Sequence, residues 1–140
     1  PVTVREAVDF VGLLFIYPNA TPVFIVEVKP PADFRLSSKR READLRLRRC
    51  FLDITPDMEI PVLYGASAFG TKIAFYQYDK ESGRLDPASI APDTHLLIDT
   101  APKEWWCYDI VEQAGADKFR EIVGEVKKMC EGVGCIVNQA

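Results

Sequence analysis

Two apolar segments joined by a short, proline-bounded turn constrain the fold of this chain more than any other feature. Residues 8–17 and 23–29 are rich in β-branched and aromatic side chains, which are typical of strands. The stretch PNATP at 18–22 is a turn sequence, and strands joined by so short a loop form an antiparallel hairpin. Both strands are apolar on both faces, so we expect the hairpin to lie centrally in a sheet covered on each side.

The rest of the chain supplies further strands and two helices. Pro30 and Pro31 end the second strand, and residues 37–54 are predicted to form a helix that begins at a serine cap. The apolar face expected for this helix consists of Ala43, Leu45, Leu47, Cys50 and Phe51. Residues 61–68 and 71–78 are predicted strands, the stretch from 79 to 104 is expected to be loop and irregular structure, and 108–132 a long amphipathic helix. This order predicts an α/β or α+β fold, a mixed sheet with helices against it, in one domain spanning residues 1–140.

Composition excludes several classes of protein. No apolar run approaches the ~20 residues that cross a bilayer, and the first residues lack the pattern of a signal peptide. The four cysteines form no CxxC pair, which favours reduced thiols over a zinc site. We therefore expect an intracellular protein, cytoplasmic or nuclear, that does not contact a membrane. The chain begins at a proline, so we keep open that it is a piece of a longer protein lacking an upstream helix.

Charge is unevenly distributed along the chain. The net charge is −4, yet the stretch from residue 35 to residue 49 holds seven basic residues against two acidic ones. This is a local positive patch on a helix, and its functional interpretation is contact with the phosphates of nucleic acid. The candidates for that contact are Arg40, Arg41, Arg48 and Arg49. The alternative is a helix face that is merely solvated.

The second strand of the hairpin ends in two opposite charges. Glu27 and Lys29 are two residues apart, so both side chains point to the same face of the strand. Asp9 lies at the start of the partner strand, which antiparallel pairing brings to the same end of the hairpin. Two converging carboxylates repel one another unless a cation sits between them, and Mg²⁺ takes oxygen ligands of this kind. A neighbouring lysine can hold a water molecule or stabilise a charged transition state.

The hairpin register decides how closely these charges approach. A five-residue loop pairs Tyr17 with Val23, and this sets Asp9 opposite Pro31. That position is four residues beyond Glu27, or about 13 Å along the strand. A bulge at Gly12 would shorten the gap.

The pattern of Asp9 followed by VEVK, with Glu27 and Lys29, resembles the D…ExK signature of the PD-(D/E)XK, or restriction-endonuclease-like, nuclease superfamily. The resemblance implies that Asp9 and Glu27 bind Mg²⁺ or Mn²⁺ and that Lys29 assists the attacking water. It also implies a metal-dependent endo- or exonuclease that hydrolyses phosphodiester bonds of DNA or RNA. The stretch from VEVKPPADFRL through IPVLYGASAFGTKIAFYQYD is similar to a group of uncharacterised fungal proteins from mushrooms, from which no activity follows.

A second hypothesis is a catalytically degenerate member of that fold, acting as an interaction or regulatory module. Only PVTVREA precedes the predicted strand that carries Asp9, so we expect the helix that opens the family core to be short or absent. That shortness and the acidic isoelectric point favour the degenerate alternative, whereas the intact ExK favours the enzyme. Trp105, Trp106 and Tyr108 either stack on bases or anchor the irregular segment to the core.

Overall fold

The computed structural model describes residues 13–16 and 22–132. Its strands are β1 (Leu13–Ile16), β2 (Phe24–Lys29), β3 (Val62–Phe69), β4 (Lys72–Asp79), β5 (Arg84–Asp86) and β6 (Tyr108–Asp109). The two α-helices are α2 (Ser37–Ile54) and α3 (Gln113–Gly132). Short 3-10 helices follow β2 at Pro31–Arg35, follow α2 at Thr55–Asp57, and precede β6 at Lys103–Trp105.

The strands form one mixed sheet in the order β1-β2-β3-β4-β5, with β6 paired to β4. β1 and β2 are antiparallel, which confirms the predicted hairpin over its described part. β2 and β3 are parallel, so α2 serves as the crossover connection that parallel neighbours require. β3 and β4 are antiparallel and turn at Gly70, whose φ of 61° suits glycine. The expected α+β fold with a mixed sheet is confirmed.

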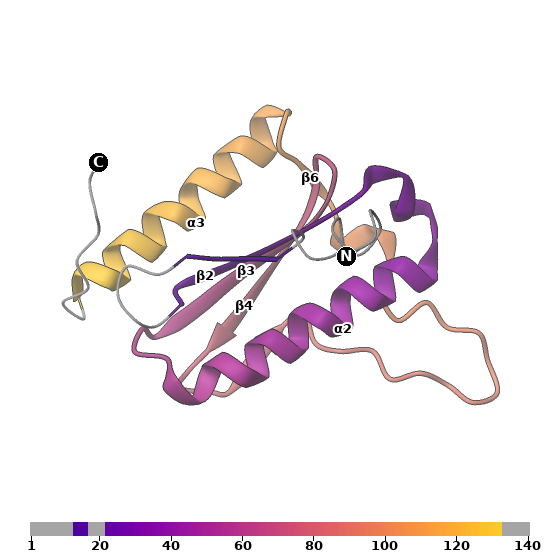
Figure 1. Ribbon diagram of the computed structural model, residues 1–140, viewed down its shortest axis with the longest axis horizontal. Helices are drawn as coiled ribbons and strands as arrows, with labels where there is room; N and C mark the ends of the chain where they lie inside the picture. Colours follow the sequence, from indigo (N-terminus) through magenta and orange to yellow (C-terminus); the bar gives the residue numbers. More distant parts are fainter. Residues whose placement is uncertain (1–12, 17–21, 133–140) are drawn as a thin grey trace, which may run out of the picture.

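The sheet is covered by one helix on each face, giving three layers, as Figure 1 shows. Alternate residues of β2 point to opposite faces, and their contacts identify the two layers. The ring of Phe24 lies 6.0 Å from that of Phe119 on α3. Glu27, on the other face, lies 3.9 Å from the guanidinium of Arg46 on α2. Both faces of β2 are thus covered, as expected. The expectation that the hairpin lies centrally is wrong for β1, which is an edge strand among the described strands.

The buried face of α2 differs from the predicted one. Leu45 was expected on the apolar face but is 52% exposed, whereas Arg40 and Asp44 are buried. The residues that α2 buries are Arg40, Ala43, Asp44, Leu47 and Phe51. They follow the three- and four-residue spacing of one helix face, so the helical period is obeyed although two of its members are charged. The prediction is confirmed for Ala43, Leu47 and Phe51, and it was wrong for Leu45 because it assigned residues to the face by polarity.

Two short strands and the start of α3 also differ from the sequence prediction. β5 lies in a stretch predicted as loop, and β6 occupies residues predicted as the first turn of the long helix. Tyr108 and Asp109 pair with β4, and the N–H of Ile110 donates to the carbonyl of Thr71. These backbone bonds hold residues 108 and 109 in an extended conformation and Ile110 in the turn that follows, so α3 begins at Gln113.

The irregular segment before β6 is anchored by aromatic packing. Trp106 is 4% exposed, and its ring lies 5.5 Å from that of Phe69 and 6.1 Å from that of Phe34. Phe34 and Phe69 are themselves 5.7 Å apart, which completes a three-ring cluster at one end of the sheet. Of the two functions considered for Trp106, the structure supports the anchor. Among the described residues, none of the helices is long and apolar enough to span a bilayer.

Two glycines of α3 provide a test of its packing. A methyl group at Gly115 would clash with the backbone oxygen of Asp109, whereas one at Gly124 would meet nothing within 4 Å. We expect Gly115→Ala to lower the free energy of unfolding by about 3 kcal/mol, because the helix start must move away from β6. Gly124→Ala is the matched control and should raise it by up to about 1 kcal/mol through helix propensity. Urea titration measures both, and equal stability of the two variants would contradict this packing.

Candidate functional site

Glu27 and Lys29 lie where the hairpin prediction places them relative to each other. Both belong to the face of β2 that α2 covers, and Ser67 and Phe69 are their register partners on β3. Leu13 is opposite Glu27, and Ile16 is opposite Phe24, which is the register that the five-residue loop predicts. The other predicted ligand, Asp9, and the bulge suggested at Gly12 lie outside the described residues.

The carboxylate of Glu27 is fully enclosed. Glu27 is 0% exposed, and so is Ser67 beside it on β3. Within the described part of the chain, neither oxygen of Glu27 accepts a hydrogen bond of good geometry, and the hydroxyl of Ser67 also makes none. Among the described ion pairs, Nε of Arg46 on α2 lies 3.9 Å from Oε2 of Glu27. Buried carboxylates normally have hydrogen-bond partners, so this group has spare capacity for a further partner.

Burial sets the protonation of this group. Removal from water raises the pKa of Glu27 from 4.5 to about 7. Lys29 and Arg46 oppose the rise in pKa because they favour the charged form, Asp44 adds to it, and the nearby hydroxyl of Ser67 lowers it slightly. A carboxyl group with this pKa exchanges a proton near neutral pH, and it binds a metal ion only after losing that proton.

A second buried carboxylate lies close by and was missed in the sequence. Asp44 is 4% exposed and accepts a 2.7 Å hydrogen bond from the hydroxyl of Tyr76. Nε of Arg48 donates to both of its oxygens, at 2.9 and 3.0 Å. The guanidinium of Arg48 also lies over the rings of Tyr76 and Trp105. The i,i+4 spacing of Asp44 and Arg48 was the available signal, because such a pair on the buried side of a helix forms a bonded ion pair.

Two of the four arginines predicted to contact nucleic acid form structural bonds. Arg40 is 3% exposed and donates hydrogen bonds to the carbonyls of Ala101 and Phe34 and to Asp99, at 2.9, 2.6 and 2.6 Å. It therefore ties α2 to the segment that precedes β6. Arg48 is held by Asp44 in the same layer. Contact of the Arg40 guanidinium with a phosphate would require these bonds to break, whereas Nη2 of Arg48 is buried and has no hydrogen-bond partner among the described residues.

Arg41 and Arg49 have a different environment. Both are exposed on α2, eight residues apart and therefore on the same outward side, about 12 Å apart along the helix axis. Leu45 and Leu52 are exposed on that side as well. These two arginines are the members of the predicted set that present their charge to solvent.

The arrangement offers a small set of chemical capabilities. Lys29 and Glu27 together can exchange a proton or stabilise developing negative charge, and Glu27 and Ser67 offer hard oxygen donors. In the ranges that the structure describes, no group of three or more histidine, cysteine or acidic residues gathers to hold a metal ion. A complete ligand set would need Asp9. Comparisons with family models, curated proteins and solved structures return no match, so the function is argued from this geometry.

The pKa of Glu27 predicts a specific pH dependence of stability. Between pH 4.5 and about 7 the folded state keeps a proton that the unfolded state has released. The free energy of unfolding should therefore fall as pH rises through this window, by roughly 3 kcal/mol for a shift of this size. Glu27→Gln is neutral throughout, so its stability relative to the wild type should rise by about 2–3 kcal/mol from pH 5 to pH 8.

Urea unfolding at the two pH values, in buffer with a chelator, measures this difference. Glu59→Gln, at an exposed position in the loop before β3, is the matched control and should follow the wild type at both pH values. A constant difference between Glu27→Gln and the wild type across the window would show that Glu27 keeps an ordinary carboxyl pKa.

The contrast between Arg40 and Arg41 gives a second test. Arg40→Ala removes three hydrogen bonds and leaves two carbonyls and a carboxylate without their donor. We expect it to lower the free energy of unfolding by about 3 kcal/mol or more. Arg41→Ala, one residue along and exposed, should change it by less than about 0.5 kcal/mol. Thermal unfolding followed by circular dichroism separates the two, and similar stabilities would contradict a structural role for Arg40.

Proposed function

We propose that this chain is a metal-dependent nuclease-like domain of the PD-(D/E)XK type that hydrolyses phosphodiester bonds in DNA or RNA. One observation carries the proposal. Glu27 and Lys29 lie together on one face of β2, and the oxygens of Glu27 accept no hydrogen bond of good geometry from the described residues. A buried carboxylate with unused acceptor capacity is what a site for a hard cation needs, and the resemblance assigns the lysine beside it to the attacking water.

The order of elements supports the proposal. The strand that carries Glu27 and Lys29 is the second of an antiparallel hairpin and is followed by α2 and then by the parallel strand β3. A hairpin, then a helix and a further strand is the order that the resemblance to the restriction-endonuclease-like fold implies. Likeness in topology does not establish activity, so the proposal depends on the residues of the site.

Glu27 and Asp9 are the residues that would hold the ion. Bound Mg²⁺ or Mn²⁺ would supply Lewis-acid activation of the phosphate and of the attacking water. Ser67 would add a neutral oxygen beside Glu27, and the ammonium of Lys29 would stabilise charge that develops on the phosphate. Arg41 and Arg49 are the exposed arginines through which α2 would contact the backbone of the nucleic acid.

A second candidate function is a catalytically degenerate domain that serves as an interaction or regulatory module. The observation in its favour is that Glu27 is fully covered and has a pKa of about 7. A carboxyl group that is half protonated at neutral pH binds a divalent ion weakly, because the proton competes with the metal for the same oxygens. The structural bonds of Arg40 and Arg48 also favour this second function, because they leave fewer positively charged side chains to bind a nucleic acid.

The deciding experiment is cleavage by the wild type beside Lys29→Met. Plasmid DNA, single-stranded DNA and RNA are incubated with Mg²⁺, with Mn²⁺ or with EDTA. We expect cleavage that needs the metal and that falls by at least about 100-fold in Lys29→Met, because the variant keeps the apolar stem and loses the ammonium. Lys80→Met, at an exposed position after β4, is the matched control and should cleave like the wild type.

A second measurement tests metal binding apart from activity. If Glu27 is a ligand, Mg²⁺ should raise the melting temperature of the wild type at pH 8 and leave that of Glu27→Gln nearly unchanged. Absence of cleavage on all three substrates, together with a melting temperature that no metal alters, would exclude the nuclease and leave the degenerate module.

A further inference from the structure

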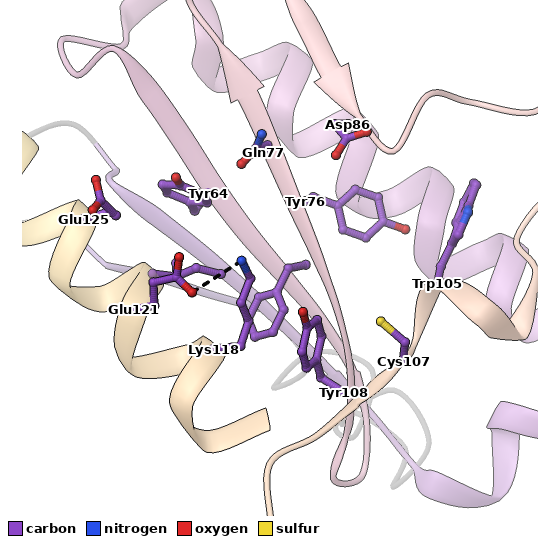
Figure 2. Close-up of a pocket in the computed structure, with 12 residues that line it drawn as sticks. Tyr64, Tyr76, Gln77, Asp86, Trp105, Cys107, Tyr108, Lys118, Glu121 and Glu125 are labelled. Atoms are coloured by element: carbon purple, nitrogen blue, oxygen red, sulfur yellow. Dashed lines mark ion pairs between the residues drawn. The ribbon is translucent and has the colours of Figure 1, made fainter. Parts of the chain in front are cut away.

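A cavity lies against the outer part of β4, where the pairing of the sheet edge is interrupted. β5 pairs with β4 at 77–79 and β6 pairs with it at 72–73, so residues 74–76 of β4 pair with neither strand. The cavity has a volume of about 320 Å³ and is closed on one side by α3 (Figure 2). Because a water molecule takes about 30 Å³ of liquid, this space fits an organic ligand rather than one or two waters.

Aromatic side chains form much of the cavity wall. Tyr64 and Phe75 come from the face of the sheet that α3 covers, Trp105 comes from the segment before β6, and Tyr108 is the first residue of β6. Phe75 and Tyr108 pack edge to face, with ring centroids 5.6 Å apart. Figure 2 shows Tyr64 and Trp105 at opposite ends of the group of labelled aromatic side chains, with Tyr76 and Tyr108 between them. Aromatic faces carry negative charge density and attract cations. The guanidinium of Arg48 already lies over the Trp105 ring, which leaves Tyr64, Phe75 and Tyr108 for a ligand.

The charged residues of the cavity are mainly acidic. Asp86, Glu121 and Glu125 line it, against the single base Lys118 among the lining residues. Lys118 is itself paired with Glu121 at 3.6 Å. Lys128 approaches Glu125 at 4.0 Å, although it does not line the cavity, and an exposed pair at that distance contributes little. The lining therefore has an excess of negative charge.

The raised pKa of Tyr64 reflects the same excess of negative charge. Its pKa is raised first by burial, then by Glu125 and also by Glu121, and Lys118 opposes the rise only in part. Glu121 and Glu125 thus act electrostatically on the hydroxyl of Tyr64, although they project from another element. A cation placed against this ring would gain from both carboxylates as well as from the aromatic face.

We infer that this cavity binds an organic cation of the quaternary-ammonium type, held against Tyr64 and its aromatic neighbours and balanced by Glu121 and Glu125. Methyl groups around a positive nitrogen suit apolar aromatic walls, and the charge suits the acidic rim. Tyr64, Glu121 and Glu125 lie on the α3 side of the sheet, opposite Glu27, so the inference does not depend on the proposed nuclease.

The test uses tetramethylammonium, choline and free N-trimethyl-lysine as ligands, followed by calorimetry or by chemical-shift changes in the full chain without divalent metal. The control ligand is 3,3-dimethylbutan-1-ol, which has nearly the shape of choline and no charge. We expect saturable binding of the cations and affinity at least about fivefold weaker for the alcohol. Either choline or trimethyl-lysine as the tightest ligand supports the inference and identifies the source of the cationic group.

Two matched pairs of variants locate the binding. Tyr64→Leu should weaken choline binding by roughly tenfold, whereas Tyr64→Phe keeps the ring and should stay within about twofold of the wild type. Glu125→Gln should weaken it by about threefold, and Glu131→Gln, on the same helix but outside the cavity, should not. If Tyr64→Leu does not fold, the glutamate pair decides. No saturable binding, equal affinity for choline and the alcohol, or binding insensitive to Glu125→Gln would overturn the inference.

Discussion

The structure depends on how α2 compensates the charges that β2 carries into the interior. Glu27 is buried in the centre of the layer between the sheet and this helix, and an isolated carboxylate there would be strongly destabilising. The layer responds in two ways. Lys29 and Arg46 are close enough to favour the charged form, and burial raises the pKa enough for a proton to be held near neutrality. The same helix brings in Asp44, fully bonded to Tyr76 and Arg48. One carboxylate is thus satisfied by the fold and the other retains unused acceptors.

Much of the fold follows from patterns that the sequence displays. The apolar hairpin, its register, the two helices and the strands β3 and β4 were predicted because each has a clear period or a proline or glycine boundary. β5 and β6 were not, because strands of three and two residues show no period and exist only through pairing with β4. The buried face of α2 was misassigned for a related reason. Arg40 is buried because distant partners, Ala101 and Asp99, accept its hydrogen bonds, and no local pattern reveals them.

The candidate site was predictable to a similar extent. Strand alternation alone places Glu27 and Lys29 on one face, since residues two apart share a side. Alternation does not reveal which helix covers that face or how completely, and complete burial is what gives Glu27 its raised pKa. The burial of the arginines was likewise not predictable from the sequence. Composition identifies a basic helix, but only its packing separates Arg40 and Arg48, which are bonded internally, from Arg41 and Arg49, which are exposed.

β4 links the two regions to which we assign chemistry. Its alternate residues serve different layers, with Tyr76 bonded to Asp44 beneath α2 and Phe75 packed against Phe119 beneath α3. The two layers also differ in charge. Beneath α2 the Arg48–Asp44 ion pair balances a buried acid, whereas the cavity beneath α3 is lined by aromatic rings and by more acidic than basic side chains. A rigid strand of this kind can support two sites without coupling them, since a change on one face leaves the backbone of the other in place. Substitutions in the cavity beneath α3 should therefore leave the titration of Glu27 unaltered. The routes for any coupling are Tyr76, which is bonded to Asp44, and Trp105, whose ring lies under Arg48, since both line the cavity.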